Sequence, residues 1–363
     1  PTITPDRFGW FPQVDFHTPG GPIEVGLSPQ RLIALVTIWI LTWINLRGIR
    51  EGKFVQTTLT LVKTGALVAL IVLGLTIGRN AQAVAANFGP GNFAGGVSIT
   101  SAFMIAFGAS LVGSLFASDA WNNVTFAAAE VQNPKRNLPL ALFLGTGLVT
   151  VIYLMANVAY LNVLPLHGVK DASGVLERGI QYATQDRVGS AAAEMIFGAI
   201  GGSIMAAAIL VSTFGCNNGL ILSGARVYYA MARDGLFFRK VGQLNKNHVP
   251  AFGLITQAIW ASLLCLTGTY GQLLDYVIFA ALIFYVFTTI GLFILRQKLP
   301  DAERPYRAFG YPVLPALYIV LAATVAVVLL ISASTRAQAL SGLVLVALGI
   351  PVYFLWRKAE PQP

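Results

Sequence analysis

The chain has 363 residues, of which 56% are hydrophobic and 11% charged, and its mean hydropathy is +0.69. A soluble domain carries about 25% charged residues, so the solvent of this chain is predicted to be lipid rather than water. The net charge of +9 does not indicate a nucleic-acid partner, because the basic residues lie in short loops between apolar runs.

The order of polar and apolar stretches predicts an all-α polytopic membrane protein. Residues 1–30 are polar and rich in Pro and Gly, which is typical of an external loop. Nine apolar runs follow and form one predicted transmembrane domain over 31–356, with a cytoplasmic tail at 357–363. Each run is near or above the length that crosses about 30 Å of hydrocarbon, and each should be helical because open sheet edges cannot face lipid. The run 191–225 is long for one span, so its helix is expected to continue beyond the bilayer. The runs are 31–47, 54–78, 99–128, 138–162, 191–225, 251–268, 272–295, 312–334 and 339–356.

The basic residues divide unequally between the two sets of loops. One set carries 16 Lys and Arg and the other carries 7, and Lys63 within a span completes the 24. Because cytoplasmic loops carry the excess of Lys and Arg, the first set is predicted to be cytoplasmic, with residue 1 outside and residue 363 inside. The richer set comprises Arg47, Arg50, Lys53, Lys135, Arg136, Arg226, Arg233, Arg239, Lys240, Lys246, Arg296, Lys298, Arg304, Arg307, Arg357 and Lys358; the poorer set comprises Arg7, Arg31, Arg79, Lys170, Arg178, Arg187 and Arg336.

One apolar run contains a carboxylate. No charged side chain occurs from Asn80 through Ser118, and then Asp119 follows, with Asn122 and Asn123 close behind it. A carboxylate at bilayer depth costs about 2.5–3.5 kcal/mol on insertion scales, so a chain keeps one where it faces a cavity or a partner. A spanning helix with a polar break at mid-depth is how a transporter builds a binding site.

Lys63 is a second charge within a predicted span. It lies about ten residues, or about 15 Å at 1.5 Å per residue, from the cytoplasmic start of its helix. From that depth the side chain does not easily reach either surface by snorkelling. Two interpretations of Lys63 remain: it forms a structural pair with Asp119 at similar depth, or it has a functional role.

The remaining residues give little support to an enzyme. His17, His167 and His248 fall in loops far apart in the sequence, and no nucleophile elbow, phosphate-binding loop or metal-ligand pair occurs. Cys216 and Cys265 lie inside apolar runs, which is typical of reduced packing residues. A channel is the alternative from another class, but channels use repeated pore-lining rings, whereas this chain has one broken helix with single polar groups. We therefore expect no catalysis, no cofactor and no metal.

Four stretches carry a more specific signal. They are Ile44–Arg50 with Leu61–Lys63; Phe116–Trp121 with Glu130–Pro139; Ser212–Gly219 with Ala225–Gly235; and Pro300–Arg307. Together, and in this order over almost the whole chain, they resemble the amino acid–polyamine–organocation transporters, and among these the L-type amino acid exchangers and their bacterial relatives.

The resemblance implies the family's fold of twelve helices, built as two inverted repeats of five plus a final pair. The nine predicted spans are similar to its fourth to twelfth helices. The chain is therefore interpreted as N-terminally incomplete, and three further spans, the first with a Gly/Ser-rich break, are expected upstream. In the family, the unwound first and sixth helices hold the carboxylate and amine of the substrate, and only the sixth falls in this chain.

The unwound segment of the sixth helix is the part of the site that the resemblance places here. Phe116 resembles the family's gating aromatic, whereas Trp121 is as often an interfacial or packing residue. The family commonly has Gly where Ala120 stands, so this segment is expected to unwind less easily. Asp119 either favours cationic substrate side chains or hydrates the vestibule of a transporter for neutral substrates. The candidate substrate-binding and gating residues are Phe116, Ala117, Ser118, Asp119, Ala120 and Trp121.

The resemblance also gives Lys63 a role. L-type relatives carry a lysine here, where sodium-coupled transporters of the same fold bind a cation, so a fixed ammonium would make sodium unnecessary. Ser212 and Thr213 lie on the span that flanks the equivalent cation site, and their alternative is ordinary hydrogen bonding to the backbone or a neighbouring helix. The Gly215/Gly219 spacing on the same span permits close helix contact.

The sequence thus predicts a secondary active transporter of L-amino acids in the plasma (cell inner) membrane, working by alternating access and sodium-independent exchange. Proton-coupled uptake of amino acids or polyamines is the alternative within the family. The expected partners are an amino acid substrate and the bilayer, without nucleic acid. Residues 1–30 contain no Cys, so no disulfide-linked heavy chain is expected.

Overall fold

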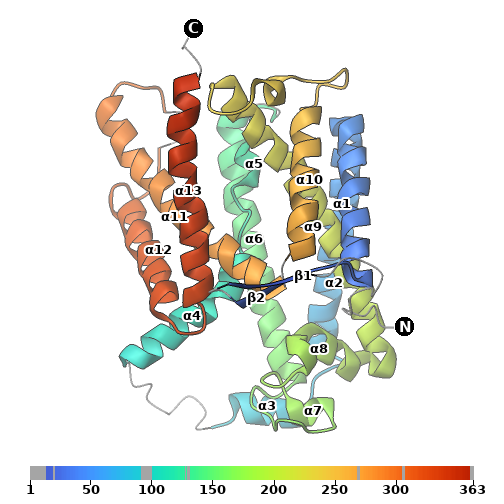
Figure 1. Cartoon of the computed structure of the whole chain (residues 1–363). Helices are drawn as coiled ribbons and strands as arrows, with labels where there is room; N and C mark the ends of the chain where they lie inside the picture. The colour runs from blue at the N-terminus through green and yellow to red at the C-terminus, as the bar shows by residue number, and fades with distance from the viewer. Residues whose placement is uncertain are drawn as a thin grey trace. The chain divides into compact units, whose positions relative to one another are not determined.

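The computed structural model describes residues 14–18, 21–90, 100–126, 128, 131–267, 270–304 and 307–359 (Figure 1). Two parts of the predicted external loop, 1–13 and 19–20, lie outside the described residues. The end of the predicted tail, 360–363, also lies outside them. The chain divides into two compact units that alternate along the sequence. Unit 1 comprises residues 1–46, 98–140 and 223–363, and unit 2 comprises residues 47–97 and 141–222.

Within the described residues, seven helical segments are long and apolar enough to cross a bilayer, and each coincides with a predicted span. The two other predicted spans fall on helices of 17 residues, Ser101–Ala117 and Ala251–Thr267. On the long segments, large apolar side chains such as Phe143 and Val320 are 76% and 60% exposed, as expected where the solvent is lipid. The predicted helical, multi-pass membrane fold is confirmed, and nine crossings stay a prediction. The seven segments are Pro29–Arg47, Phe54–Leu75, Pro134–Val163, Val188–Arg233, Val277–Lys298, Val313–Ile331 and Arg336–Phe354.

Unit 1 holds a short hairpin and most of the C-terminal helices. Strands β1 (Val14–Thr18) and β2 (Gly21–Val25) pair antiparallel, with Val14 opposite Val25. The hairpin is a local addition to the all-α fold, in a stretch whose polar composition predicted only a loop. The helices of unit 1 are α1 (Pro29–Arg47), α4 (Ser101–Ala117), α5 (Asn123–Phe126), α10 (Ala251–Thr267), α11 (Tyr270–Lys298), α12 (Val313–Ile331) and α13 (Arg336–Ala359), with the short 3-10 helix η4 (Arg239–Gly242).

The core of unit 1 brings α4, α11, α12 and α13 together. Gly108 lets α4 approach α12, because a Cβ at this position would lie 2.5 Å from Cγ1 of Val328. The packing fixes the end of α4 beside α11, which is where the candidate substrate residues begin. The buried core residues are Val112, Ile278, Phe279, Leu282, Ala322, Leu329 and Ala339.

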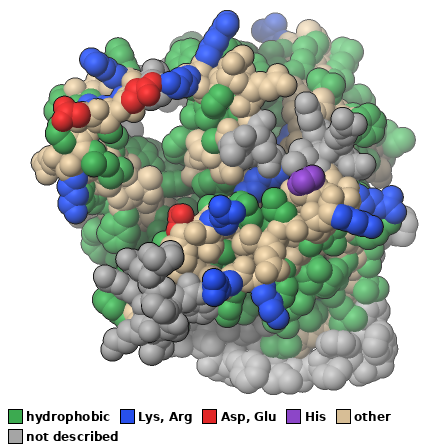
Figure 2. Space-filling view, turned by 90° about the horizontal axis from the view of Figure 1, so that it is seen from above, with side chains coloured by type: hydrophobic (Ala, Val, Ile, Leu, Met, Phe, Trp, Pro, Cys, Tyr) green, Lys and Arg blue, Asp and Glu red, His purple; other side chains and the backbone are tan. Residues whose placement is uncertain are grey.

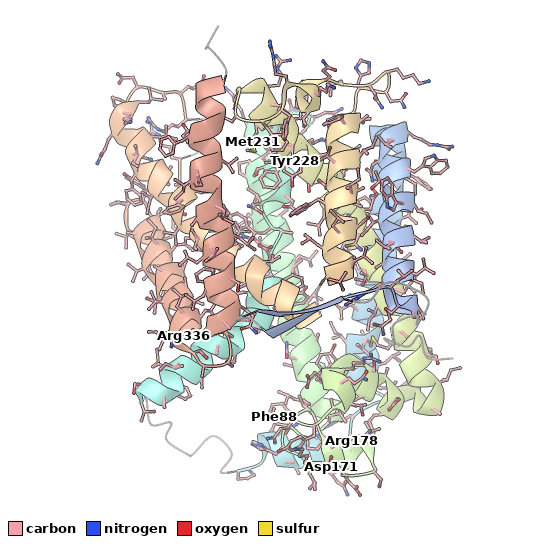
Figure 3. All side chains as sticks on the ribbon, in the orientation of Figure 1. Phe88, Asp171, Arg178, Tyr228, Met231 and Arg336 are labelled. Carbon is pink, nitrogen blue, oxygen red and sulfur yellow. The ribbon has the colours of Figure 1, made fainter. Side chains whose placement is uncertain are left out.

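Unit 2 contains α2 (Ile49–Leu75), α3 (Ala81–Phe88), α7 (Val175–Arg178), η2 (Thr184–Asp186), α8 (Val188–Phe197) and η3 (Gly198–Ile200), with most of α6 (Pro134–Val163) and α9 (Gly201–Arg233). Asn87 ties α3 to the end of α6, since its Nδ2 donates to the carbonyls of Leu161 and Leu164 at 2.7 and 2.8 Å. Figure 3 shows Phe88 of α3 at the same end of this unit as Asp171 and Arg178. The core at this end consists of Val163, Leu164, Ala183, Ala191 and Ala192.

The long predicted span 191–225 is not one helix. α8 ends at Phe197, and Gly198 has a φ of 69°, a left-handed conformation that glycine adopts without a Cβ clash. α9 then continues for 33 residues, about 50 Å at 1.5 Å per residue. Its length exceeds the hydrocarbon thickness of about 30 Å, as predicted. Tyr228 and Met231, labelled in Figure 3, lie in its last turns.

Candidate functional site

The predicted break in the sixth-helix segment is present in unit 1. α4 ends at Ala117, α5 begins at Asn123, and residues 118–122 between them form turns (Figure 1). Ala120 has a φ of 64°, in the left-handed region that costs a residue with a Cβ about 1–2 kcal/mol. The segment therefore unwinds although Ala120 replaces the expected glycine, and the backbone strain falls on that residue.

Local hydrogen bonds close the end of α4. Ser118 Oγ donates to the carbonyls of Ser114 and Leu115 at 2.9 and 3.1 Å, and the Asp119 backbone N–H donates to the carbonyl of Phe116 at 3.2 Å. A helix C-terminus presents carbonyls with partial negative charge, which is the chemistry that accepts an ammonium. The predicted substrate segment is thus unwound, and its role in substrate binding stays a prediction.

Asp119 is held by a side chain that the sequence analysis did not identify. The hydroxyl of Tyr285, on α11, donates to Oδ1 of Asp119 at 2.5 Å. The rings of Trp121 and Tyr285 pack at a centroid distance of 6.0 Å with a tilt of 48°. Tyr285 thus contacts two of the six predicted residues. A hydroxyl in the middle of an apolar span needs a partner, and that was the signal available in the sequence.

The two aromatic candidates differ in their surroundings. Phe116 and Trp121 are 39% and 46% exposed, so both rings are partly accessible beside the break. The ring of Trp121 packs on that of Tyr285. This contact fits the packing role that was the alternative to substrate binding. The roles of Phe116 and Trp121 in substrate binding and gating stay predictions.

Lys63 lies in unit 2, near the middle of α2, a helix without interruption from Ile49 to Leu75. Its Nζ donates to Sγ of Cys216 on α9 at 3.4 Å. Cys216 is a free thiol and is exposed, so it is not the packing residue that the sequence predicted. The half-buried Cys265 does fit that prediction.

Glycines bring α2 and α9 together around this lysine. A Cβ at Gly215 would lie 2.9 Å from Cβ of Leu59, and a Cβ at Gly219 would lie 3.3 Å from Oε1 of Gln56. One turn away, Nδ2 of the buried Asn218 donates to the same Gln56 oxygen at 3.2 Å. The close helix contact that the Gly215/Gly219 spacing permits is present, and it places Lys63 against α9.

Ser212 and Thr213, predicted to flank a cation-like site, lie on α9, the helix that also carries Cys216. Thr213 Oγ1 donates to the carbonyl of Ile209 at 2.8 Å, which is the ordinary backbone bond given as its alternative. Ser212 lies one turn before Cys216 and so on the same side of α9. Within the described residues, the side-chain partner of Lys63 is Cys216 rather than Ser212 or Thr213. No group of three or more potential metal-ligating His, Cys, Asp or Glu side chains occurs in the part of the chain that the structure describes.

The arrangement defines a multi-pass membrane protein with a broken helix at one intramembrane charge and a packed lysine at another. Comparison with known proteins gives its family. Residues 19–354 match the model of the family described as amino acid permease, and the chain belongs to this family.

Relatives of known name agree with this membership. The chain is 33% identical over 338 residues to the serine/threonine exchanger SteT of Bacillus subtilis, an alignment that covers 92% of this chain and 71% of the exchanger. It is 28% identical to the human b(0,+)-type amino acid transporter 1, with 94% and 68% covered, and 30% identical to the human large neutral amino acids transporter small subunit 2, with 94% and 59% covered. The chain thus spans about 60 to 70% of the length of these relatives.

Proposed function

We propose that the full-length protein is a secondary active transporter that exchanges L-amino acids across the plasma membrane by alternating access. The observation that carries the proposal is the break between α4 and α5 in a member of the amino acid permease family. The named relatives are an exchanger and two amino acid transporters, which supports amino acids as the substrate class.

The broken segment is proposed to bind the substrate. The carbonyls at the end of α4 accept the substrate ammonium, and Phe116 closes over the substrate as a gate. Asp119 is proposed to influence which substrate side chains are accepted. Its described partner within unit 1 is the neutral hydroxyl of Tyr285, so its charge is free to complement a cationic side chain or to order water beside a neutral one.

Lys63 is proposed to take the place of the cation that sodium-coupled transporters of this fold bind. Its ammonium lies on the α2–α9 contact beside Cys216, on the helix that also carries Ser212 and Thr213. A fixed positive charge at this point supplies what a bound sodium ion supplies, so exchange requires no sodium. The loops rich in Lys and Arg are proposed to face the cytoplasm, with the start of this chain outside.

Proton-coupled uptake is a second candidate, favoured by the single carboxylate at the break. Asp119 is half-buried at the break and accepts a hydrogen bond from Tyr285, so it is the residue at which such coupling is proposed. Exchange and uptake differ in what drives them. Exchange requires an amino acid inside the vesicle, whereas uptake requires a pH gradient.

Counterflow into proteoliposomes tests the proposal. The full-length protein is reconstituted, the vesicles are loaded with unlabelled serine, leucine or arginine, and entry of the labelled amino acid is followed without an ion gradient. Saturable entry that depends on the internal amino acid is the expected result. Entry that needs an imposed pH gradient supports the second candidate, and a non-saturating current under voltage clamp supports a channel and contradicts the transporter.

A further inference from the structure

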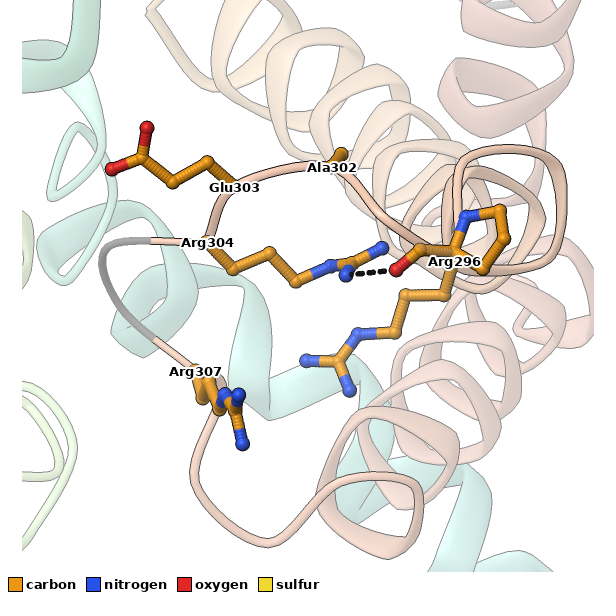
Figure 4. Close-up of a pocket in the computed structure, with 6 residues that line it drawn as sticks. Arg296, Ala302, Glu303, Arg304 and Arg307 are labelled. Atoms are coloured by element: carbon orange, nitrogen blue, oxygen red, sulfur yellow. Dashed lines mark hydrogen bonds between the residues drawn. The ribbon is translucent and has the colours of Figure 1, made fainter.

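A pocket of about 560 Å³ lies in unit 1, between the end of α11 and the loop that leads to α12. It is apart from the broken helix, and the function proposed above does not use it. Its lining is rich in arginine: Arg296, Pro300, Ala302, Glu303, Arg304 and Arg307 (Figure 4). The lining contains three guanidinium groups and one carboxylate, so the pocket has an excess of positive charge.

The lining carboxylate is already paired with a lysine from outside the pocket. Glu303 Oε1 is 2.6 Å from Nζ of Lys135, a residue of α6 that does not line the pocket. Glu303 is therefore shared with Lys135 and offsets the charge of the arginines only in part. Like charges gathered in one pocket repel one another, and an anion between them removes that repulsion.

Two of the arginines are fixed in position by contacts that leave donors free. Arg304 donates from its two terminal nitrogens to the carbonyls of Pro300 and Leu299 at 2.7 and 2.5 Å. The guanidinium of Arg296 lies 3.7 Å from the centre of the Tyr311 ring, which holds its plane by a cation–π contact. Figure 4 shows both side chains reaching into the space that the loop encloses.

Arg296 has a donor that is not used within the described part of the chain. Nε of Arg296 is buried and has no hydrogen-bond partner there. An arginine offers five N–H donors in a planar fork that matches the oxygens of a phosphate, and a buried donor without a partner is costly. The geometry points to an oxyanion of the phosphate class as the missing partner.

The position of the pocket identifies the source of the phosphate. It lies where two membrane-crossing segments end, at Lys298 of α11 and Val313 of α12, which is the level of lipid headgroups. Two residues after Arg307, the large apolar side chain of Phe309 is 82% exposed. It also belongs to the loops that carry most Lys and Arg, and Figure 2 shows such side chains (blue) exposed on the face seen there.

We propose that this pocket binds the headgroup of an anionic phospholipid, with Arg296, Arg304 and Arg307 on the phosphate and the acyl chains along the apolar side chains beside it. Basic pockets between membrane helices on the cytoplasmic side recognise such headgroups. A lipid bound here joins the end of α11 to the loop before α12. α11 is the helix that carries Tyr285, the partner of Asp119.

Lipid titration of the full-length protein in detergent tests the proposal. Phosphatidylglycerol is expected to raise the thermal unfolding midpoint of the wild type in a saturable way, whereas phosphatidylcholine with the same acyl chains is not. The double variant Arg296→Gln/Arg307→Gln is expected to weaken the apparent affinity for phosphatidylglycerol by at least about tenfold, because charge-assisted bonds to phosphate are lost. Lys240→Gln/Lys246→Gln removes two exposed basic side chains from the same set of loops and is expected to bind like the wild type.

Three outcomes decide against the proposal. Equal affinity in the arginine variant and the lysine control would mean that the arginines do not hold the lipid. The same saturable rise with inorganic phosphate alone would make the pocket a site for a soluble anion instead. Glu303→Gln gives a test that misfolding cannot mimic, because removing the carboxylate raises the positive charge and should tighten phosphatidylglycerol binding; unchanged or weaker binding contradicts the proposal.

Discussion

Asp119 lies in a break between two helices, whereas Lys63 lies near the middle of a helix of 27 residues that has no break. Around Asp119 the backbone is unwound, Ala120 is left-handed, and the two flanking aromatic side chains are exposed. Around Lys63, glycines let α2 and α9 touch, and the ammonium rests on the thiol of Cys216.

The difference separates two uses of an intramembrane charge. In the proposed function, a carboxylate beside unwound backbone meets a ligand that comes and goes. In the same proposal, an ammonium on a continuous, tightly packed helix stays in place and replaces a bound ion. The comparison therefore predicts that changes at the break alter substrate handling, and that changes around Lys63 alter either the transport cycle or the packing of unit 2.

Removing the lysine should have the largest effect. Lys63→Ala deletes a charged donor whose hydrogen bonds are worth about 1.5–3 kcal/mol each, so exchange is expected to fall about 10- to 100-fold at matched expression. Initial rates of counterflow measure it, with Lys240→Ala as an exposed control. Stability is expected to fall much less than transport.

A double variant distinguishes this role from a structural ion pair. If Lys63 only neutralised Asp119, the variant Lys63→Ala/Asp119→Asn would leave no unpaired charge and would recover activity relative to either single variant. Such recovery would show that the assignment of Lys63 to the transport cycle is wrong. The account predicts no recovery.

Closing the glycine contact should reduce stability. A Cβ at Gly215 would lie 2.9 Å from Cβ of Leu59, so Gly215→Ala forces α2 and α9 apart at a cost of about 1–3 kcal/mol. Gly145→Ala is the matched control in the same unit, because a Cβ there meets nothing within 4 Å. Thermal unfolding in detergent compares the two. A melting temperature lowered equally by both variants would argue against a tight contact beside Lys63.

Removing one hydroxyl should affect the break. Tyr285→Phe keeps the ring that packs on Trp121 and deletes the bond to Asp119, which should lower exchange about tenfold for a loss of about 1.5 kcal/mol. Competition by arginine, relative to leucine, should change as well, since Asp119 loses its fixed orientation. Tyr353→Phe, at an exposed tyrosine of α13, serves as the control. Identical rates and competition in both variants would remove Tyr285 from the site.

Relieving the strained residue should have the smallest effect. Ala120→Gly places glycine at a φ of 64° and is expected to stabilise the protein by up to about 1 kcal/mol. Ala109→Gly, in the interior of α4, should instead destabilise by about 0.5–1 kcal/mol. Unfolding midpoints of the two variants are predicted to move in opposite directions, and a shift in the same direction would contradict a left-handed Ala120.

The helices and both charges could be predicted because their signals are local. Apolar runs give the spans, and a lone Asp or Lys within such a run indicates a site. The partners could not, because they lie far away in the sequence: Tyr285 is 166 residues from Asp119, and Cys216 is 153 residues from Lys63. Cys216 was misinterpreted for the same reason, since an apolar run does not show which of its side chains meets an ammonium. The break after Phe197 was missed because glycines such as Gly198 and Gly201 also occur inside membrane helices, where they let helices pack closely. Their presence alone therefore does not indicate a break.

Sodium replacement tests the central claim most directly. Full-length wild-type protein in proteoliposomes is assayed for amino acid counterflow in sodium chloride and in choline chloride, with Lys63→Ala measured alongside. The account predicts equal saturable exchange in the two salts for the wild type and a strong loss in both for the variant. Strict dependence of wild-type exchange on sodium would contradict the claim that the ammonium of Lys63 stands in for a bound cation.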